Sequence, residues 1–146
     1  MNLRLNANAI ITNNHGQILI IKLKKGPFAG GYCIPGGGIN PGELSFETIK
    51  REIKEETGLE IKKSLEPFGF CELIHYGKKD HRVVLLLKGK GNGALKETEE
   101  GSPEWASAEG IEKKLIPFAR EAVKIWKEGK NHFKLLDEEC LPSWCL

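Results

Sequence analysis

Residues 36–59, GGGINPGELSFETIKREIKEETGL, decide the fold of this chain. The second half of the stretch predicts one helix, because Pro41-Gly42 precedes it and Gly58 can adopt the left-handed conformation that ends a helix at little cost. At about 100° per residue, three carboxylates fall on one face of that helix, those of Glu52, Glu55 and Glu56. About a quarter-turn away lies an apolar stripe of Phe46, Ile49 and Ile53. The helix can therefore bury one side and present carboxylates on another.

The three glutamates need either solvent or a counter-charge. Like charges on neighbouring positions of a helix repel each other by roughly a few tenths of a kcal/mol per pair. Hard divalent cations such as Mg²⁺ or Mn²⁺ prefer oxygen ligands and would supply that counter-charge. A solvated acidic face is the alternative interpretation, and the residues around the helix favour the metal.

The spacing around the helix matches a known signature. From Gly37 the chain has a glycine, five residues, Glu43, seven residues and then REIKEETGL from Arg51 to Leu59. This pattern resembles the Nudix box of the Nudix hydrolase superfamily at every fixed position and at both aliphatic positions. The resemblance implies an α/β (α+β) fold, in which a mixed β-sheet lies between helices and the box forms a loop, a helix and a loop. It also implies a metal-dependent hydrolase, with Mg²⁺ or Mn²⁺ as cofactor, that cleaves the pyrophosphate bond of a nucleoside diphosphate linked to another group.

The same resemblance assigns roles to the box residues. Glu55 and Glu56 are expected to be the principal metal ligands, and Glu52 a further ligand or the group that orients or deprotonates water. The carbonyl oxygen of Gly37 is expected to be an additional ligand. Arg51 would hold Glu52 or its neighbours in position. The expected catalytic residues are Arg51, Glu52 and Glu55.

The glycines and Glu43 have supporting roles in this prediction. Gly36, Gly37 and Gly38 let the backbone approach a metal–phosphate cluster closely, and the start of the helix offers free N–H groups to an anion. Gly36 and Gly38 are therefore predicted to contact substrate. Glu43 would brace the helix or reach an outer metal.

Five candidate residues lie outside the box. Glu100 is similar in position to a glutamate that completes the metal site in the family, with Glu97, Glu99 and Glu104 as alternatives and a solvated acidic loop as the competing interpretation. Lys22 sits where Nudix enzymes often place a basic residue against phosphates, although an exposed lysine at a strand end explains it equally well. Three aromatic residues are candidates for contact with the base, with core packing as the alternative for each: Phe28, Tyr76 and Phe118.

The remaining chain predicts strands and two further helices. The segments at 3–12 and 17–23 form a predicted hairpin around the turn at 13–16, and the apolar run at 83–87 predicts a central strand covered on both faces. The other expected strands lie at 32–35, 59–61, 63–76 and 104–107, and the expected helices at 108–116 and 117–127. The second of these helices has an apolar face that can cover the side of the sheet opposite the box helix.

Length and composition exclude several classes of protein. A chain of 146 residues suits one domain, expected at 1–129, with a tail at 130–146 that packs on the domain or on a partner subunit. The net charge of +2 gives no support for nucleic-acid binding, and the apolar runs are too short to span a membrane. We therefore expect a cytoplasmic monomer or homodimer that binds a small-molecule nucleotide. Cys140 and Cys145 match no common metal-site spacing.

Several functions fit this sequence. The first hypothesis is a housecleaning enzyme that splits a (d)NTP into a monophosphate and pyrophosphate, because the chain is compact and shows no second domain. Dinucleoside polyphosphates are the second choice of substrate because of Tyr76, followed by ADP-ribose and nucleotide sugars. A nucleotide-binding module that has lost hydrolysis is the alternative outside enzymes, and the complete set of box carboxylates argues against it. Removal of an RNA cap would be expected to bring extra domains or a basic surface.

Overall fold

The structure of the protein is a computed structural model, which describes residues 1–137. The strands are β1 (Asn2–Thr12), β2 (Ile18–Leu23), β3 (Tyr32–Cys33), β4 (Gly36–Gly38), β5 (Glu66–His75), β6 (Asp80–Lys90), β7 (Gly101–Ala106) and β8 (His132–Leu136). The helices are α1 (Ser45–Thr57), α2 (Ala108–Ile111) and α3 (Pro117–Glu128), with a 3₁₀ turn at Glu112–Lys114. Within the described residues, no helix is both long and apolar enough to cross a membrane.

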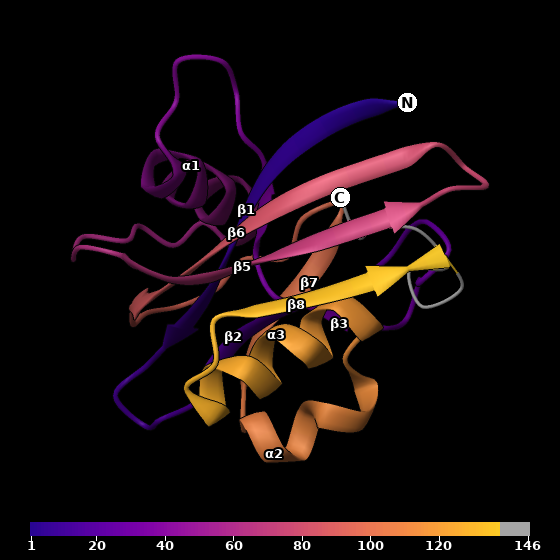
Figure 1. The fold of residues 1–146 in the computed structure, drawn as a ribbon. Coiled ribbons are helices and arrows are strands. Elements are labelled where there is room, and N and C mark those ends of the chain that lie inside the picture. The colour runs from indigo at the N-terminus through magenta and orange to yellow at the C-terminus, as the bar shows by residue number, and fades with distance from the viewer. Residues whose placement is uncertain (138–146) are drawn as a thin grey trace.

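The strands form one mixed sheet in the order β3-β2-β1-β6-β5-β8. β4 pairs with β1, and β7 pairs with β2 outside this path. The β1–β6 and β5–β8 pairs are parallel, whereas the other pairs are antiparallel. α1 lies on one side of the sheet and α2 and α3 on the other (Figure 1). The predicted fold, a mixed sheet between helices, is confirmed.

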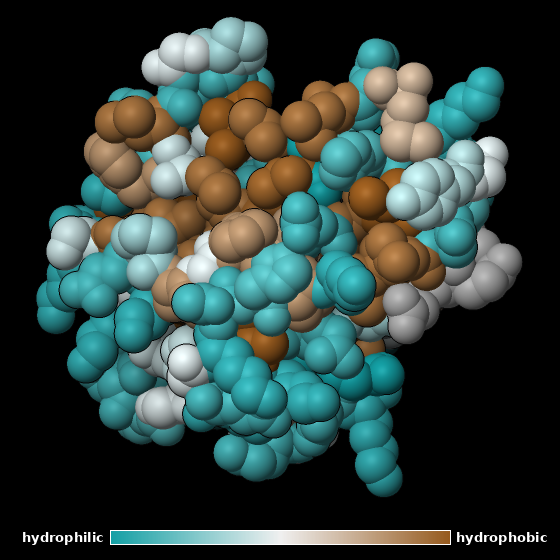
Figure 2. All heavy atoms as spheres, in the orientation of Figure 1, coloured by the Kyte–Doolittle hydropathy of each residue, from teal (hydrophilic) through white to brown (hydrophobic). Residues whose placement is uncertain are grey.

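Two apolar clusters, one on each side of the sheet, hold the layers together. Under α1, Ile49 and Ile53 are fully buried against Ala7, Ala9 and Ile11 of β1 and other residues. The alternate β1 residue Ile10 belongs to the other cluster, which packs against α3. This division follows from the two-residue period of a strand, because successive side chains point to opposite faces. The outer surface of α2 and α3, in the lower half of the view, is mostly hydrophilic (Figure 2).

Phe46 does not follow the predicted apolar stripe. Its side chain is 40% exposed, and the Lys50 ammonium lies 5.7 Å from the centre of its ring. Instead, Thr48 and Thr57 are buried on α1, and the Thr57 hydroxyl donates a hydrogen bond to the carbonyl oxygen of Ile53. Hydroxyls of this kind can be buried because the preceding helical turn satisfies them.

Several element boundaries differ from the prediction. The hairpin of β1 and β2 and the central position of β6 are confirmed, but residues 59–61 form no strand; Leu59 and Ile61 are buried as irregular chain under α1. The predicted helix at 108–116 ends early, since Leu115 is extended and Pro117 favours an extended residue before it. The strand predicted at 104–107 begins at Gly101, because it pairs with β2 along its length.

Part of the predicted tail is a strand of the sheet. β8 pairs with β5 in parallel, with Leu73 opposite Leu135. Leu135 is buried, and the ring of Phe133 lies 6.2 Å from that of Phe118 in α3. Residues 130–137 therefore pack on the same domain, which the sequence analysis left open. Cys140 and Cys145 lie outside the described residues.

Gly36 is expected to be irreplaceable for folding. Its φ angle is +154°, and an added Cβ would collide with the Ala7 carbonyl and with Asn8 on β1. We expect Gly36→Ala to lower the free energy of unfolding by roughly 3 kcal/mol, measured by urea denaturation. Gly38→Ala is the matched control, since a Cβ there meets nothing within 4 Å. Equal stability of the two variants would contradict the prediction.

Candidate active site

Local interactions fix both ends of α1. At its start, the backbone N–H of Leu44 donates a hydrogen bond to the Glu47 carboxylate, with an N–O distance of 2.8 Å. At its end, Gly58 has a φ of +77°, and its N–H donates to the carbonyl oxygen of Lys54. These hydrogen bonds pair backbone groups that would otherwise lack partners at the two ends of the helix, so the helix begins and ends at defined residues. The predicted helix end at Gly58 is therefore confirmed.

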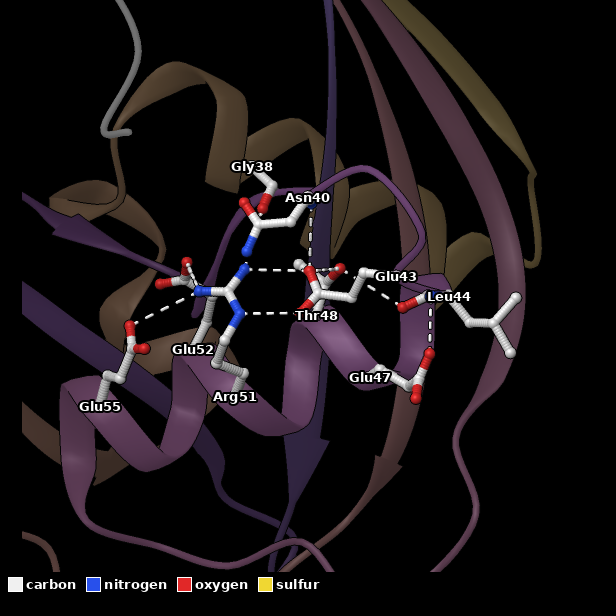
Figure 3. Close-up of polar contacts among 9 residues, drawn as sticks. All are labelled: Gly38, Asn40, Glu43, Leu44, Glu47, Thr48, Arg51, Glu52 and Glu55. Atoms are coloured by element: carbon white, nitrogen blue, oxygen red, sulfur yellow. Dashed lines mark hydrogen bonds and ion pairs between the residues drawn. The ribbon is translucent and has the colours of Figure 1, made fainter.

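Arg51 joins the helix to the loop that precedes it (Figure 3). Its guanidinium donates two hydrogen bonds to the Glu43 carboxylate, at 2.8 and 3.0 Å, and one to the Gly38 carbonyl oxygen at 3.0 Å. A fourth hydrogen bond, of 2.8 Å, reaches the carboxylate of Glu52. Glu55 forms a longer ion pair with the same guanidinium at 3.6 Å. Arginine suits this position because its planar group donates in several fixed directions at once.

Glu43 is held from three sides. It accepts hydrogen bonds from Arg51, from the Thr48 hydroxyl at 2.7 Å and from the backbone N–H of Asn40 at 3.2 Å. The hydrogen bonds from Arg51 and Thr48 lower the pKa of Glu43 to about 2. Since all these partners lie in the loop or on the first turns of α1, Glu43 acts as the brace that the resemblance implied.

A cavity of about 500 Å³ opens beside this network. α1 contributes Glu52 and Glu56, and the strand before it contributes Gly36, Gly37 and Gly38. Two loops supply further lining residues, among them Lys25, Phe28, Thr98 and Glu100. Three carboxylates from two distant segments thus line one cavity together with a glycine strand, a basic residue and an aromatic ring. A cavity that combines charged side chains with an apolar lining can bind a phosphorylated ligand.

Glu52 lies in the most constrained position. Its side chain is only 18% exposed, and the carboxylate packs so closely over Gly37 that a Cβ at that glycine would collide with it. Burial raises the pKa of Glu52, the Arg51 hydrogen bond opposes this effect, and the charges of Glu55 and Glu100 add to it. The positive charge of Arg51 alone therefore does not fully compensate the cost of burying the Glu52 carboxylate.

Glu56 and Glu55 differ from Glu52 in exposure. Glu56 is half-buried and accepts a hydrogen bond of 3.3 Å from the backbone N–H of Gly36. The side chain of Glu55 is 60% exposed. On this face of the helix, Glu52 and Glu56 are thus partly shielded from solvent, whereas Glu55 lies at the surface.

The donor chemistry of the cavity fits a hard divalent cation. Glu52, Glu56 and Glu100 offer only oxygen atoms, and burial together with the charges of Glu55 and Glu100 disfavours the charged form of Glu52. These carboxylates do not yet converge: among residues 1–137, no group of three or more His, Cys, Asp and Glu side chains is close enough together to hold a metal ion. The cavity therefore contains suitable ligands but no preformed cluster.

The predicted substrate-binding residues divide into two groups. Gly36, Gly38 and Phe28 line the cavity. Lys22, Tyr76 and Phe118 lie elsewhere. Lys22 is exposed, and its side chain points to the opposite face of β2 from those of its neighbours Ile21 and Leu23, which line the cavity.

The two aromatic residues are also placed away from the cavity. Tyr76 is 57% exposed after the end of β5, where its backbone N–H donates to the Asp137 carboxylate. Phe118 is 5% exposed and packs with Phe133 in the core.

Lys25 is a cavity residue that the sequence analysis did not select. The loop at 24–31 has two adjacent lysines, and Lys24 is engaged by the Glu97 carboxylate at 3.3 Å and the Thr98 carbonyl oxygen at 2.8 Å. Lys25 lines the cavity beside Phe28. The sequence pattern does not reveal which lysine of this region lines the cavity.

Comparisons with known proteins agree with this geometry. A family model described as the NUDIX domain matches residues 2–126. A Bacillus subtilis protein described as a candidate 8-oxo-dGTP diphosphatase is 28% identical over 123 residues, which cover 84% of this chain and 79% of that protein. An ADP-ribose pyrophosphatase from Methanocaldococcus jannaschii is 49% identical over 49 residues, or 34% of this chain and 29% of that protein. The crystal structure of a MutT protein from Bacillus halodurans has the same fold, with a TM-score of 0.77 at 23% identity, and covers 91% of this chain and 89% of that one.

Arg51 is expected to be the largest single contributor to the order of the box loop. Arg51→Met removes all the hydrogen bonds to Glu43, Glu52 and Gly38 and should lower the urea midpoint of unfolding clearly. Lys54→Met is the control on the same helix, because its exposed ion pair with Glu60 contributes little. A midpoint that falls no further for Arg51→Met than for Lys54→Met would show that the network does not stabilise the fold.

Proposed function

Since the chain belongs to the NUDIX domain family, we propose that it is a metal-dependent enzyme that hydrolyses a nucleoside triphosphate to a monophosphate and pyrophosphate. The observation that carries this proposal is the shared cavity of Glu52, Glu56, Glu100 and the glycine strand. The Bacillus subtilis relative, described as a candidate 8-oxo-dGTP diphosphatase, covers most of this chain and supports a triphosphate as substrate.

The metal would be held by carboxylate oxygens. Glu52, Glu56 and Glu100 line the cavity, and Glu55 lies on the same face of α1 at its solvent side. The carbonyl oxygen of Gly37 is a further proposed ligand. Bound Mg²⁺ or Mn²⁺ would neutralise phosphate oxygens and lower the pKa of water.

The side chains themselves would orient the reactants. Glu52 is fixed by Arg51 and shielded from solvent, so its carboxylate can hold a water molecule in one direction and accept its proton. Gly38 allows the phosphate chain to approach the backbone, because a Cβ at this position would meet nothing within 4 Å.

Lys25 is the proposed partner of the phosphate chain in the loop. Its ammonium would compensate the charge of a triphosphate in a cavity otherwise dominated by carboxylates. Phe28 lines the same cavity and offers an apolar surface for the base or sugar. Both residues belong to the loop at 24–31, so this loop, held by the sheet, would determine which nucleotide binds.

ADP-ribose is the second candidate substrate. It has support from the relative named as an ADP-ribose pyrophosphatase, although that match spans about a third of this chain. Dinucleoside polyphosphates lose their main support, since Tyr76 lies away from the cavity. A hydrolysis screen of (d)NTPs, 8-oxo-dGTP, ADP-ribose and nucleotide sugars, with Mg²⁺ and Mn²⁺ separately, tests the choice. Release of pyrophosphate from one triphosphate supports the proposal; turnover of ADP-ribose alone replaces it.

Removal of one cavity carboxylate is expected to abolish most of the activity. Glu56→Gln keeps the shape of the side chain and removes a proposed metal-ligand charge, so turnover should fall at least roughly a hundredfold. Glu60→Gln, an exposed carboxylate after α1, is the control and should change turnover by less than about twofold. The chelator EDTA should likewise stop the reaction of the unmodified protein. A normal rate for Glu56→Gln would remove that residue from the proposed metal site.

Two lysine variants test which basic residue meets the phosphates. Lys25→Met should raise the KM for the triphosphate by about tenfold with little change in kcat, because it removes a charge that binds substrate. Lys22→Met tests the original prediction from the sequence, and its exposed position on the other face of β2 leads us to expect an unchanged KM. The opposite result, a raised KM for Lys22→Met alone, would restore Lys22 as the phosphate ligand.

A further inference from the structure

A second hollow lies on the side of the sheet that α3 covers. Its volume is ≈ 380 Å³, within the range of small-molecule sites. We call it the lysine pocket, after the side chains of Lys63, Lys88 and Lys90 that line it together with Trp126. Lys88 and Lys90 come from the end of β6, Lys63 from the loop before β5, and Trp126 from the last turn of α3.

Strand pairing aims two of these lysines into the pocket. Lys88 pairs with Ile10 of β1, and Lys90 pairs with Thr12. Ile10 belongs to the cluster that packs against α3, and paired residues of neighbouring strands point to the same face. Lys88 and Lys90 therefore stand side by side on the α3 face of the sheet, where Trp126 also packs.

Only some of the described lysines are paired with a carboxylate. Lys24, Lys54, Lys127 and Lys130 each form an ion pair with a glutamate, at 3.0 to 3.7 Å. Within residues 1–137, Lys63, Lys88 and Lys90 form no ion pair. Of the described residues that line the pocket, Glu66 is the only acid, and it lies directly across the strand pair from Lys88. One carboxylate among three lysines leaves an excess of positive charge in the lining of the pocket.

The other side chains in the pocket complement this charge. Thr12 and Ser64 line it and have hydroxyl groups that can bind an anion, and the half-buried Trp126 contributes an indole ring to the lining. Lysine ammonium groups bind phosphate as point charges, and an indole face stacks on a base. A phosphate next to a flat ring is the chemistry of a nucleotide.

We propose that the lysine pocket is a second nucleotide site, which binds a nucleoside monophosphate with its phosphate on the lysines and its base against Trp126. The pocket shares no lining residue with the cavity that holds Glu52 and Glu56. Binding there needs no metal and is independent of the proposed hydrolysis.

Equilibrium dialysis with adenosine monophosphate and guanosine monophosphate tests this site in the presence of EDTA. The unmodified protein should bind at least one of them, and the double variant Lys88→Ser/Lys90→Ser should weaken its affinity by about tenfold or more, because it removes two phosphate-binding charges. The same variant should hydrolyse triphosphates at the normal rate. Both side chains are exposed, and an unchanged urea midpoint would verify that the variant folds.

A matched control separates local binding from bulk electrostatics. Lys113→Ser/Lys114→Ser removes the same charge from exposed positions elsewhere and should change the affinity by less than about twofold. The proposal would be overturned by no binding of either monophosphate, by equal losses in the two double variants, or by a loss that appears in Lys25→Met instead, which would locate the nucleotide in the hydrolytic cavity. Lysine-dependent binding of single-stranded oligonucleotides without binding of monophosphates would also overturn it.

Discussion

The bidentate contact between Arg51 and Glu43 is the interaction on which the site depends. It links a helix to a glycine-rich loop that has few side chains of its own for packing. The same guanidinium also binds the carbonyl oxygen of Gly38 and the carboxylate of Glu52. One residue therefore fixes the direction of α1, the path of the loop and the orientation of a proposed catalytic carboxylate.

Burial of charge is the constraint that accompanies this geometry. Glu52 is shielded and packed onto Gly37, and its pKa is raised although Arg51 binds it. A buried carboxylate without full compensation is unfavourable unless a further cation joins it. Apolar burial on the other side of the same helix, where Ile49 and Ile53 are fully buried, offsets the free-energy cost of shielding the Glu52 charge. The apolar face of α1 thus stabilises a helix whose other face carries an incompletely compensated carboxylate.

The sequence predicted those parts of the structure that depend on local patterns. The period of α1, its end at Gly58 and the mixed sheet between helices follow from local spacing and from the resemblance of one segment. Phe46 failed the prediction because the first turn of α1 leaves its side chain exposed. β8 was missed although its side chains alternate, with Phe133 and Leu135 turned inward, since a short segment near the chain end gives a weak signal. The place of Lys25 in the lining of the cavity depends on the path of the loop at 24–31, which no local pattern determines.

The linings of the two hollows carry opposite excess charge. Three carboxylates line the cavity beside α1 and favour a bound cation, whereas three lysines line the lysine pocket beside α3 and favour a bound anion. The near-neutral net charge of +2 conceals this separation, so bulk composition could not reveal either site. β1 contributes to both layers, with Ala7 and Ala9 packed toward α1 and Ile10 toward α3. A ligand on the α3 face would contact the same strand that supports Gly36 and Gly37, and any coupling between the two sites would have to pass through that strand.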